Sequence, residues 1–347
     1  MNAATHDLEH ETSIDPALRQ ALVSTHMVPL WESATAHRKE VEREQAHCWE
    51  WHKCEPILTS LARIKSPRVV ERRVISLVNP ASRSPEDEAT TGAISATLQM
   101  LLPGEVARVH RHSMNALRFV LQGQGAETVV DGVPCAMSPG DFIITPAWSW
   151  HEHRHPGGTP TIWLDVLDVA LHLALGTDEF EPGSAREMPP VMDGHWFAAP
   201  NILPIVASTS QDKSPVLRYR WETAVKAVCA APLGADGARH VRYANPLSGG
   251  PNMPLLDSTL MQVDANTATR PVRSTASAVC CVAEGSGWSQ IGGRRIEWHA
   301  HDVFTIPSLA DAEHHASNGP ARIFQVSNRD VYRRLGLLHE TCAGARF

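Results

Sequence analysis

Three histidines in two short segments are the residues best suited to chemistry. His110 and His112 are separated by Arg111, and His151 follows in the segment Trp148-Ser-Trp-His-Glu-His153. Side chains at positions i and i+2 of a β-strand point to the same side of a sheet, so we expect His110 and His112 to face one way. Three imidazoles that converge inside a β-barrel would form a site for a divalent metal ion.

The surrounding sequence predicts short strands that hold these histidines. Apolar and alternating runs occupy residues 94–102, 116–122, 126–130, 141–145 and 161–169. Turn-forming pairs rich in glycine and proline separate the runs, among them Pro103-Gly104, Asp131-Gly132 and Pro139-Gly140. Short strands at regular spacing between such turns are typical of a small antiparallel barrel or jelly roll. The histidines would then project into the interior of the barrel.

This stretch resembles the cupin superfamily, whose two motifs place glycines, histidines and a proline in fixed order. The matching positions are Gly104, His110, His112 and Gly123 in the first motif, and Gly140, Pro146 and His151 in the second. The glutamate that usually adds a fourth ligand has no counterpart, because Ala116 and Leu117 stand at its place. The resemblance therefore implies a centre of three histidines.

Within the cupins the chain is most similar to the gentisate 1,2-dioxygenase family, with its salicylate and 1-hydroxy-2-naphthoate relatives. The shared segments are His110-Arg-His112, Arg118-Phe119, Gln122-Gly-Gln-Gly-Ala126, Val130-Asp-Gly132, Gly140–His153 and Trp163-Leu-Asp165. The resemblance implies a mainly β bicupin, two tandem jelly-roll barrels preceded by a helical segment. It also implies one Fe(2+) per chain, bound by His110, His112 and His151.

The resemblance further implies which residues meet a substrate. Arg118 would contact a carboxylate, since arginine suits a bidentate pairing with that group; a structural salt bridge is the alternative. His153 would hydrogen-bond a phenolate or bound oxygen, and Asp165 would orient His153. Gln99 matches a pocket glutamine of the family. One arginine of the segment Arg72-Arg73-Val reaches the substrate in the family, and we favour Arg73 over Arg72.

One departure from the family concerns substrate size. Ser95 stands where the family usually has an aromatic residue, four positions before Gln99. That even interval places both side chains on one face of a strand. A smaller wall favours a ring-substituted 2-hydroxybenzoate such as gentisate or 5-nitro- or 5-aminosalicylate.

The activity implied is extradiol-type ring cleavage, with O2 inserted between C1, which bears the carboxyl, and C2, which bears the hydroxyl. Salicylate or 1-hydroxy-2-naphthoate 1,2-dioxygenase activity is the first alternative. A non-oxygenase metal cupin, either an isomerase or a hydrolase, and a cupin that only binds small molecules are the alternatives from other classes.

The motifs recur in the second half of the chain, which predicts an internal duplication. Gly285-Ser-Gly287 repeats Gly123-Gln-Gly125, and Asp302–Pro307 repeats Asp141–Pro146 at nearly the same interval. In this alignment Val272 and Ser274 replace the paired histidines, Cys280 replaces Arg118, and His314 and His315 lie near the place of the third ligand. We therefore expect no metal in the second barrel, which would serve packing and assembly.

We predict five regions. They are a helical arm and leading strand (1–90), the metal-binding barrel (91–175), a connection with little chemistry that contains a short helix near residues 220–228 (176–240), the second barrel (241–335) and a tail (336–347). Asp15-Pro16 begins a helix as N-cap and first-turn proline. Residues 36–46 carry charge at helical spacing, and Pro29-Leu-Trp31 and Trp49-Glu-Trp51 would anchor the arm. We expect His155 in an exposed loop.

Composition narrows the partners and the compartment. The formal net charge of −7 gives no basic footprint for nucleic acid. We expect no signal peptide and no membrane span, because the N-terminus is polar and no apolar run approaches 18 residues. Seven cysteines, an odd number, favour a reduced cytoplasmic protein. The expected partners are a small aromatic 2-hydroxy acid and O2, and the family resemblance implies a homotetramer.

Overall fold

The structure is a computed structural model that describes residues 14–29, 44–64, 73–82, 89–190 and 214–343, with the backbone of 345–346. The contacts divide the chain into two compact units, 1–42 and 43–347. The first unit holds α2 (Pro16–Ser24), whose N-cap carboxylate, from Asp15, accepts hydrogen bonds from the amides of Ala17 and Leu18. The expected helix start is therefore confirmed. The five finer regions named above stay predictions.

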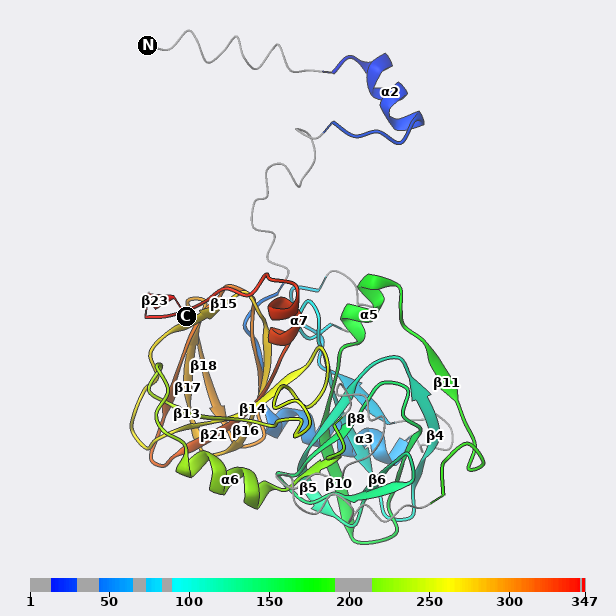
Figure 1. Cartoon of the computed structure of the whole chain (residues 1–347), viewed down its shortest axis with the longest axis vertical. Coiled ribbons are helices and arrows are strands. Elements are labelled where there is room, and N and C mark those ends of the chain that lie inside the picture. The colour runs from blue at the N-terminus through cyan, green and yellow to red at the C-terminus, as the bar shows by residue number, and fades with distance from the viewer. Residues whose placement is uncertain are drawn as a thin grey trace. The chain divides into compact units, whose positions relative to one another are not determined.

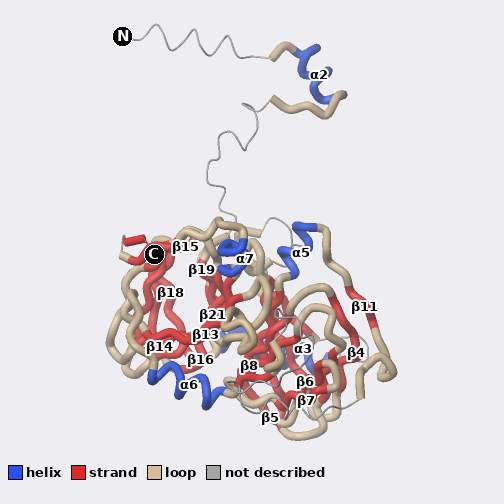
Figure 2. Tube along the Cα trace, in the orientation of Figure 1, coloured by secondary structure: helices blue, strands red, loops and turns tan. Residues whose placement is uncertain are grey.

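The second unit is built mainly from strands, coloured red in Figure 2. Its N-terminal half forms a barrel from two antiparallel sheets (Figure 1). The first, which we call the inner sheet, has the order β12-β8-β5-β10-β3-β2. Its strands are β2 (Val74–Ser76), β3 (Ser95–Leu101), β5 (Ala116–Gln124), β8 (Phe142–Thr145), β10 (Thr159–Leu167) and β12 (Arg218–Tyr219).

The second sheet of this barrel, which we call the histidine sheet, has the order β11-β4-β9-β6-β7. Its strands are β4 (Val106–His112), β6 (Glu127–Val130), β7 (Val133–Ala136), β9 (His151–Arg154) and β11 (Phe180–Pro182). The strands predicted from alternation coincide with β3, β5, β6, β8 and β10 to within two residues at nearly every end. Alternation therefore determined these elements correctly.

The C-terminal half repeats the arrangement with two six-stranded sheets, ordered β1-β19-β16-β21-β14-β13 and β18-β17-β20-β15-β22-β23. The bounds are β1 (Cys48–Trp49), β13 (Arg239–Arg242), β14 (Asp257–Val263), β15 (Val272–Ser274), β16 (Ala278–Glu284), β17 (Ser286–Ile291), β18 (Arg294–His299), β19 (Val303–Ile306), β20 (Asp311–Ala316), β21 (Ala321–Ser327), β22 (Glu340–Cys342) and β23 (Ala345–Arg346). The predicted bicupin architecture is confirmed.

An apolar core joins the two barrels. One face of the inner sheet contributes Leu98, Leu117 and Phe119 to a cluster that also contains Val279 and Phe324 of the second barrel. The rings of Phe119 and Phe324 stack with their centroids 4.3 Å apart. Each barrel also has an apolar cluster of its own. The strands that pack the barrels together are thus the strands that line the first barrel.

Glycines set the turn between β5 and β6. Gly123 and Gly125 have φ angles of +95° and +100°, which residues with a side chain rarely adopt. A Cβ atom on Gly125 would lie 1.6 Å from the carbonyl oxygen of Gly157 in the turn between β9 and β10. The two turns therefore pack backbone against backbone.

The segment before the first barrel, residues 44–64, belongs to the second unit and packs on its core. It contains β1 and α3 (Trp51–Ile64), and Trp49 and Trp51 lie against the core between the barrels. These two aromatic anchors are confirmed. The helical expectation for residues 36–46 is wrong at its end: residues 44–46 are not helical, and the Glu44 carboxylate accepts a hydrogen bond from the Gly92 amide. Residues 36–43, like Trp31, lie outside the described residues.

Helices occupy the connections. They are α5 (Val169–Leu175), α6 (Trp221–Ala230) and α7 (Arg329–Arg334). The helix expected near residues 220–228 is confirmed as α6. Among the described helices, none has the length and apolar character needed to cross a membrane.

Candidate metal centre and substrate pocket

The three predicted metal ligands come together. His110 and His112 lie on β4, His151 begins β9, and His110 pairs with His151 across the histidine sheet. One ring nitrogen of each lies within 4.8 Å of those of the other two, and all three side chains are buried. Among the described residues, these three histidines are the one set of histidine, cysteine or acidic side chains close enough together to hold a metal ion.

Backbone carbonyls fix the orientation of these imidazoles. The Nδ1 atoms of His110 and His112 lie 2.8 Å from the carbonyl oxygens of Arg108 and Met114, and that of His151 lies 3.0 Å from the oxygen of Ser149. A carbonyl oxygen only accepts, so each Nδ1 carries the proton and each Nε2 has a free lone pair. Such outer bonds are typical of histidines that ligate metals. The donor set therefore fits a divalent cation.

Burial favours the uncharged form of the His151 imidazole. Burial lowers the pKa of His151 well below its usual value, and His110 and the nearby Arg118 lower it further. The His151 Nε2 is buried and has no hydrogen-bond partner among the described residues. A neutral imidazole with a buried lone pair is the form that binds a metal ion.

A buried ion pair faces the histidines from the inner sheet. Arg118 on β5 pairs with Asp165 on β10, and the Arg118 Nε lies 3.1 Å from the Asp165 Oδ1. The Arg118 Nη1 donates to the Thr145 hydroxyl at 2.6 Å, and the Trp163 indole donates to the Asp165 Oδ2 at 2.7 Å. Burial lowers the pKa of Arg118, and Asp165 opposes that shift. Thr145 and Trp163 were not identified from the sequence, although alternation places both on the inward face.

His153 lies beside the centre, on the same face of β9 as His151. Its Nδ1 is 2.9 Å from the Thr128 hydroxyl on β6, and its ring centroid is 5.3 Å from that of Trp163. The structure thus places Thr128 at the Nδ1 of His153. Asp165 contacts Arg118 and Trp163, and its expected orienting of His153 stays a prediction. Thr128 was missed because its contact with His153 depends on the pairing of β6 with β9.

Ser95 and Gln99 lie on the inward face of β3, where alternation placed them. Both are buried, and Gln99 pairs with Trp163 on β10. The Ser95 hydroxyl has no hydrogen-bond partner within the described residues. A small polar side chain therefore stands at this point of the inward face of β3.

Arg73 is buried and engaged by Glu105. Both terminal nitrogens of its guanidinium donate to the Glu105 carboxylate, at 2.6 and 3.1 Å, and Nη1 also donates to the carbonyl of Met100. These contacts join Arg73 to the residue before β4 and to the end of β3, and its expected contact with the substrate stays a prediction. Arg72 lies outside the described residues.

The connection after residue 175 contributes to the first barrel: β11 adds a strand beside β4, and Phe180 stacks on the His110 ring with centroids 5.4 Å apart.

One further expectation is wrong. His155 was expected in an exposed loop, but it is buried, and its Nε2 lies 2.8 Å from the Thr159 carbonyl oxygen in the turn between β9 and β10.

The second barrel also differs from expectation in one respect. Ala312 pairs with Val272 as His151 pairs with His110, so Ala312 stands at the place of the third ligand. His314 pairs with Ser289 as His153 pairs with Thr128. His314 therefore corresponds to His153, and not to a ligand as the sequence alignment indicated.

An antiparallel double-sheet barrel with inward histidines on neighbouring strands defines a cupin, and residues 97–167 match the family model described as a cupin domain. The chain belongs to the family of gentisate 1,2-dioxygenases and related salicylate dioxygenases. It is 34% identical over 330 residues to gentisate 1,2 dioxygenase 1 of Aquipseudomonas alcaligenes. The matched region covers 92% of this chain and 94% of that protein. It is therefore an enzyme, a ring-cleaving 1,2-dioxygenase.

Two other relatives agree with this assignment. The chain is 30% identical to 5-aminosalicylate 1,2-dioxygenase of a Comamonas species, over 96% of this chain and 92% of that one. The crystal structure of salicylate 1,2-dioxygenase from Pseudoaminobacter salicylatoxidans, described as adducts with gentisate, superposes with a TM-score of 0.87. That match has 27% identity and covers 96% and 95% of the two chains.

The geometry predicts that His110→Ala, His112→Ala and His151→Ala each remove the bound metal, because two imidazoles hold a divalent ion poorly. Metal per chain measured by plasma mass spectrometry should fall from one to near zero, while the far-ultraviolet circular dichroism spectrum stays that of the parent. His155→Ala, which changes a buried histidine outside the centre, is the matched control and should keep its metal. Two metal ions per parent chain would contradict the single-site assignment.

Proposed function

We propose that this protein is an Fe(II)-dependent, extradiol-type dioxygenase that cleaves the bond between C1 and C2 of a 5-substituted 2-hydroxybenzoate. The observation that supports this most is the placement of three neutral metal-binding imidazoles on one sheet opposite a buried arginine on the other. The names of the relatives, gentisate and 5-aminosalicylate dioxygenases, support the same substrate class.

We infer that the Nε2 atoms of His110, His112 and His151 bind the iron. When bound, Fe(II) supplies a doubly positive centre with open coordination positions, at which an anionic chelating substrate and O2 can meet. Three neutral ligands leave that charge uncompensated by the protein. This donor set therefore favours a substrate that brings its own negative oxygens, as a 2-hydroxybenzoate does.

Arg118 would hold the substrate carboxylate. Its Nε and Nη1 are engaged by Asp165 and Thr145, and among the described residues Nη2 has no partner. An arginine fixed on one side by two contacts presents its remaining donors in a set direction, which reduces the entropy lost when the carboxylate binds. Asp165 would therefore position Arg118.

His153 would hydrogen-bond the phenolic oxygen of the substrate. The Thr128 hydroxyl holds its Nδ1, and the ring lies beside His151 and Trp163. The second nitrogen, Nε2, would then be the one that meets the substrate. Gln99 and Ser95 would line the ring, and the small Ser95 side chain would leave room for a substituent at C5.

We further propose that the enzyme works in the cytoplasm as a homotetramer. All seven cysteines are free, which supports a reducing compartment. The helix α2 has no buried residue and exposes Leu18 and Val23, which supports packing of the arm against a neighbouring subunit. Light scattering coupled to size-exclusion chromatography would measure the number of subunits.

An oxygen electrode tests the activity. We expect the Fe(II)-loaded protein to consume one O2 per molecule of gentisate or 5-aminosalicylate, with the appearance of the ultraviolet absorbance of a ring-opened dicarboxylate. Salicylate and 1-hydroxy-2-naphthoate in the same panel test the alternative substrates. A protein that binds these acids without consuming O2 would instead be a non-oxygenase cupin.

The double variant Arg118→Gln/Asp165→Asn separates substrate binding by Arg118 from a purely structural ion pair. It removes both charges, so no carboxylate is left buried without its arginine. If Arg118 binds the substrate, kcat/KM falls at least about 100-fold, corresponding to about 2.7 kcal/mol, while the iron content stays that of the parent. Recovery of parental kinetics in the double variant, with loss only in Arg118→Gln, would assign Arg118 to structure alone.

Ser95→Trp tests the substituent pocket. A tryptophan fills space that the serine leaves open, and surplus atoms in a packed site cost about 1–3 kcal/mol. The ratio of kcat/KM for 5-nitrosalicylate to that for gentisate should therefore fall about 5- to 100-fold. Ser95→Ala is the control and should leave the ratio near that of the parent. An unchanged ratio in Ser95→Trp would move the selectivity to another part of the wall.

A further inference from the structure

The second barrel contains a cavity of about 340 Å3 that the ring-cleavage chemistry does not use. Native interiors are close-packed and rarely keep a space of this size, which lies within the range of small-molecule sites. Its apolar wall includes Met261, Val272, Ile306 and Ala312, and its polar lining includes Gln325 and His314. Charged side chains also line it, among them Arg242 with Asp257 and Arg329 with Glu340. A cavity that combines an apolar wall with polar groups able to orient a ligand has the composition of a ligand pocket.

Strand register relates this cavity to the pocket of the first barrel. Thr259 pairs with Gln325 as Thr97 pairs with Asp165, so Gln325 stands at the position of the buried aspartate. The places of two metal ligands are taken by Val272 and Ala312, which offer no metal-binding atom. The aspartate and two metal ligands of the first barrel have thus been replaced at the matching positions of the second.

The second barrel retains the contact between a hydroxyl and a histidine that the first barrel has in Thr128 and His153. The Trp298 indole donates to the Ser289 hydroxyl at 2.7 Å, and that hydroxyl lies 2.7 Å from the His314 Nδ1. Ser289 is fully buried, so its own proton is satisfied when it donates to Nδ1. His314 then carries its proton on Nε2, for which the described residues provide no partner. Burial lowers the pKa of His314 to about 4, so this donor is uncharged at neutral pH.

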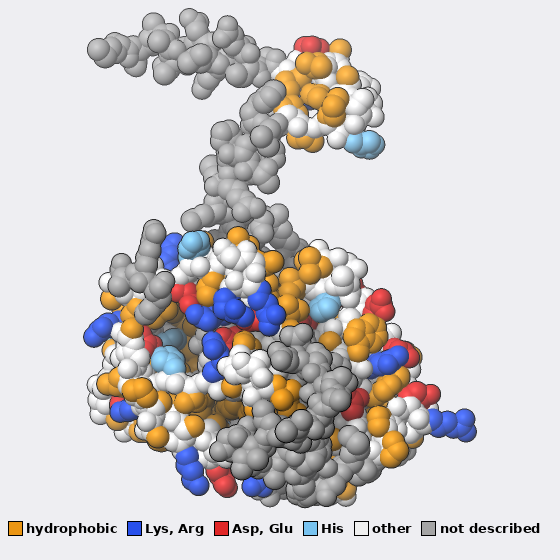
Figure 3. Space-filling view, viewed as in Figure 1, with side chains coloured by type: hydrophobic (Ala, Val, Ile, Leu, Met, Phe, Trp, Pro, Cys, Tyr) orange, Lys and Arg blue, Asp and Glu red, His pale blue; other side chains and the backbone are white. Residues whose placement is uncertain are grey.

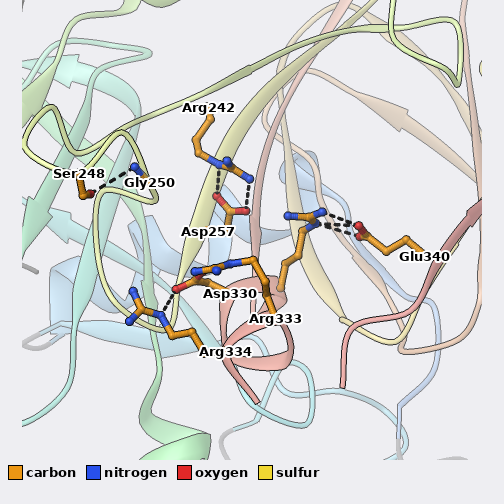
Figure 4. A network of polar contacts seen from close by, with 9 residues as sticks. Arg242, Ser248, Gly250, Asp257, Asp330, Arg333, Arg334 and Glu340 are labelled. Carbon is orange, nitrogen blue, oxygen red and sulfur yellow. Dashed lines mark hydrogen bonds and ion pairs between the residues drawn. The ribbon is translucent and has the colours of Figure 1, made fainter. Parts of the chain in front are cut away.

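The charges around the cavity neutralise one another (Figure 4). Arg242 donates to both oxygens of Asp257 at 2.9 Å, and Arg329 donates to the carboxylate of Glu340 at 2.6–3.0 Å. Figure 3 shows Lys and Arg side chains gathered on this face in the region of α7. There Arg333 and Arg334 of α7 are themselves paired with Asp330. A carboxylate ligand would have to displace one of these acids from its arginine, so the lining does not favour an anion.

From these contacts we propose that the second barrel is a metal-free binding site for an uncharged single-ring phenol. The ring would lie against the apolar wall, and the hydroxyl would accept a hydrogen bond from the His314 Nε2 and contact the Gln325 amide. This site is independent of the ring-cleavage activity proposed above, because it shares no residue with the first barrel. It differs from that pocket in taking a neutral ligand instead of an anionic one.

Fluorine NMR of 4-fluorophenol with the iron-loaded protein tests this site. We expect saturable broadening and shift of the fluorine resonance of 4-fluorophenol at millimolar concentrations or below. For the anion 4-fluorobenzoate, we expect no comparable effect from binding in the second barrel. Thr259→Phe, which fills the cavity, should abolish the effect. Thr97→Phe, the change at the equivalent register position of the first barrel, should leave it in place. Gln325→Leu keeps the volume and should weaken binding about 3- to 10-fold.

Several results would overturn the proposal. Parental binding in Thr259→Phe, or loss of binding in Thr97→Phe alone, would place the phenol in the first barrel. Equally strong binding of 4-fluorobenzoate that Thr259→Phe abolishes would show that the ligand class is wrong. If Thr259→Phe does not fold, unchanged affinity in Gln325→Leu is the result that decides against the site. O2 consumption with gentisate, measured in parallel, should be that of the parent in Thr259→Phe and Gln325→Leu.

Discussion

The alternation of side chains along β3, β5 and β10 connects the packing of the two barrels with the chemistry of the first. On β5, Leu117 and Phe119 face the apolar core between the barrels, while Arg118 between them faces the histidines. A strand has only these two faces, so a shift of one residue in register would bury the arginine in the apolar core and place two apolar side chains in the pocket. The register of this sheet therefore fixes both the packing of the barrels and the position of Arg118.

The interior of the first barrel combines three histidine side chains with one buried arginine, which is paired with Asp165. Nδ1–carbonyl contacts orient the three histidines so that each Nε2 carries the lone pair, and burial lowers the pKa of His151. On the facing sheet, Arg118 pairs with Asp165 and donates to Thr145, and the Trp163 indole donates to Asp165. Because a buried charge without partners is costly, this set of contacts lets a guanidinium stand next to a cation-binding site. A doubly anionic substrate would complement the two positive groups.

Duplication left two barrels with the same register but different interiors. The hydroxyl–histidine pair survives in both, as Thr128–His153 and as Ser289–His314. The ligand positions were replaced by Val272 and Ala312, and the buried ion pair by Cys280 and Gln325, which are themselves paired on neighbouring strands. The second barrel thus keeps a histidine at the place of His153 and a cavity, while the metal ligands and the Arg118–Asp165 pair are replaced.

The sequence alone determined the strands, the duplication, the three histidines and the inward face of Ser95, Gln99 and Arg118. These follow from local rules, since alternation with a period of two and the motif spacings are properties of neighbouring residues. The sequence did not determine which side chains contact one another across neighbouring strands. Only the tertiary structure joined Thr128 to His153, directed Arg73 to Glu105, brought Phe180 onto His110 and placed Ala312, instead of His314, at the third ligand position. Pairing across a sheet joins residues far apart in the chain, and no local pattern specifies the partner.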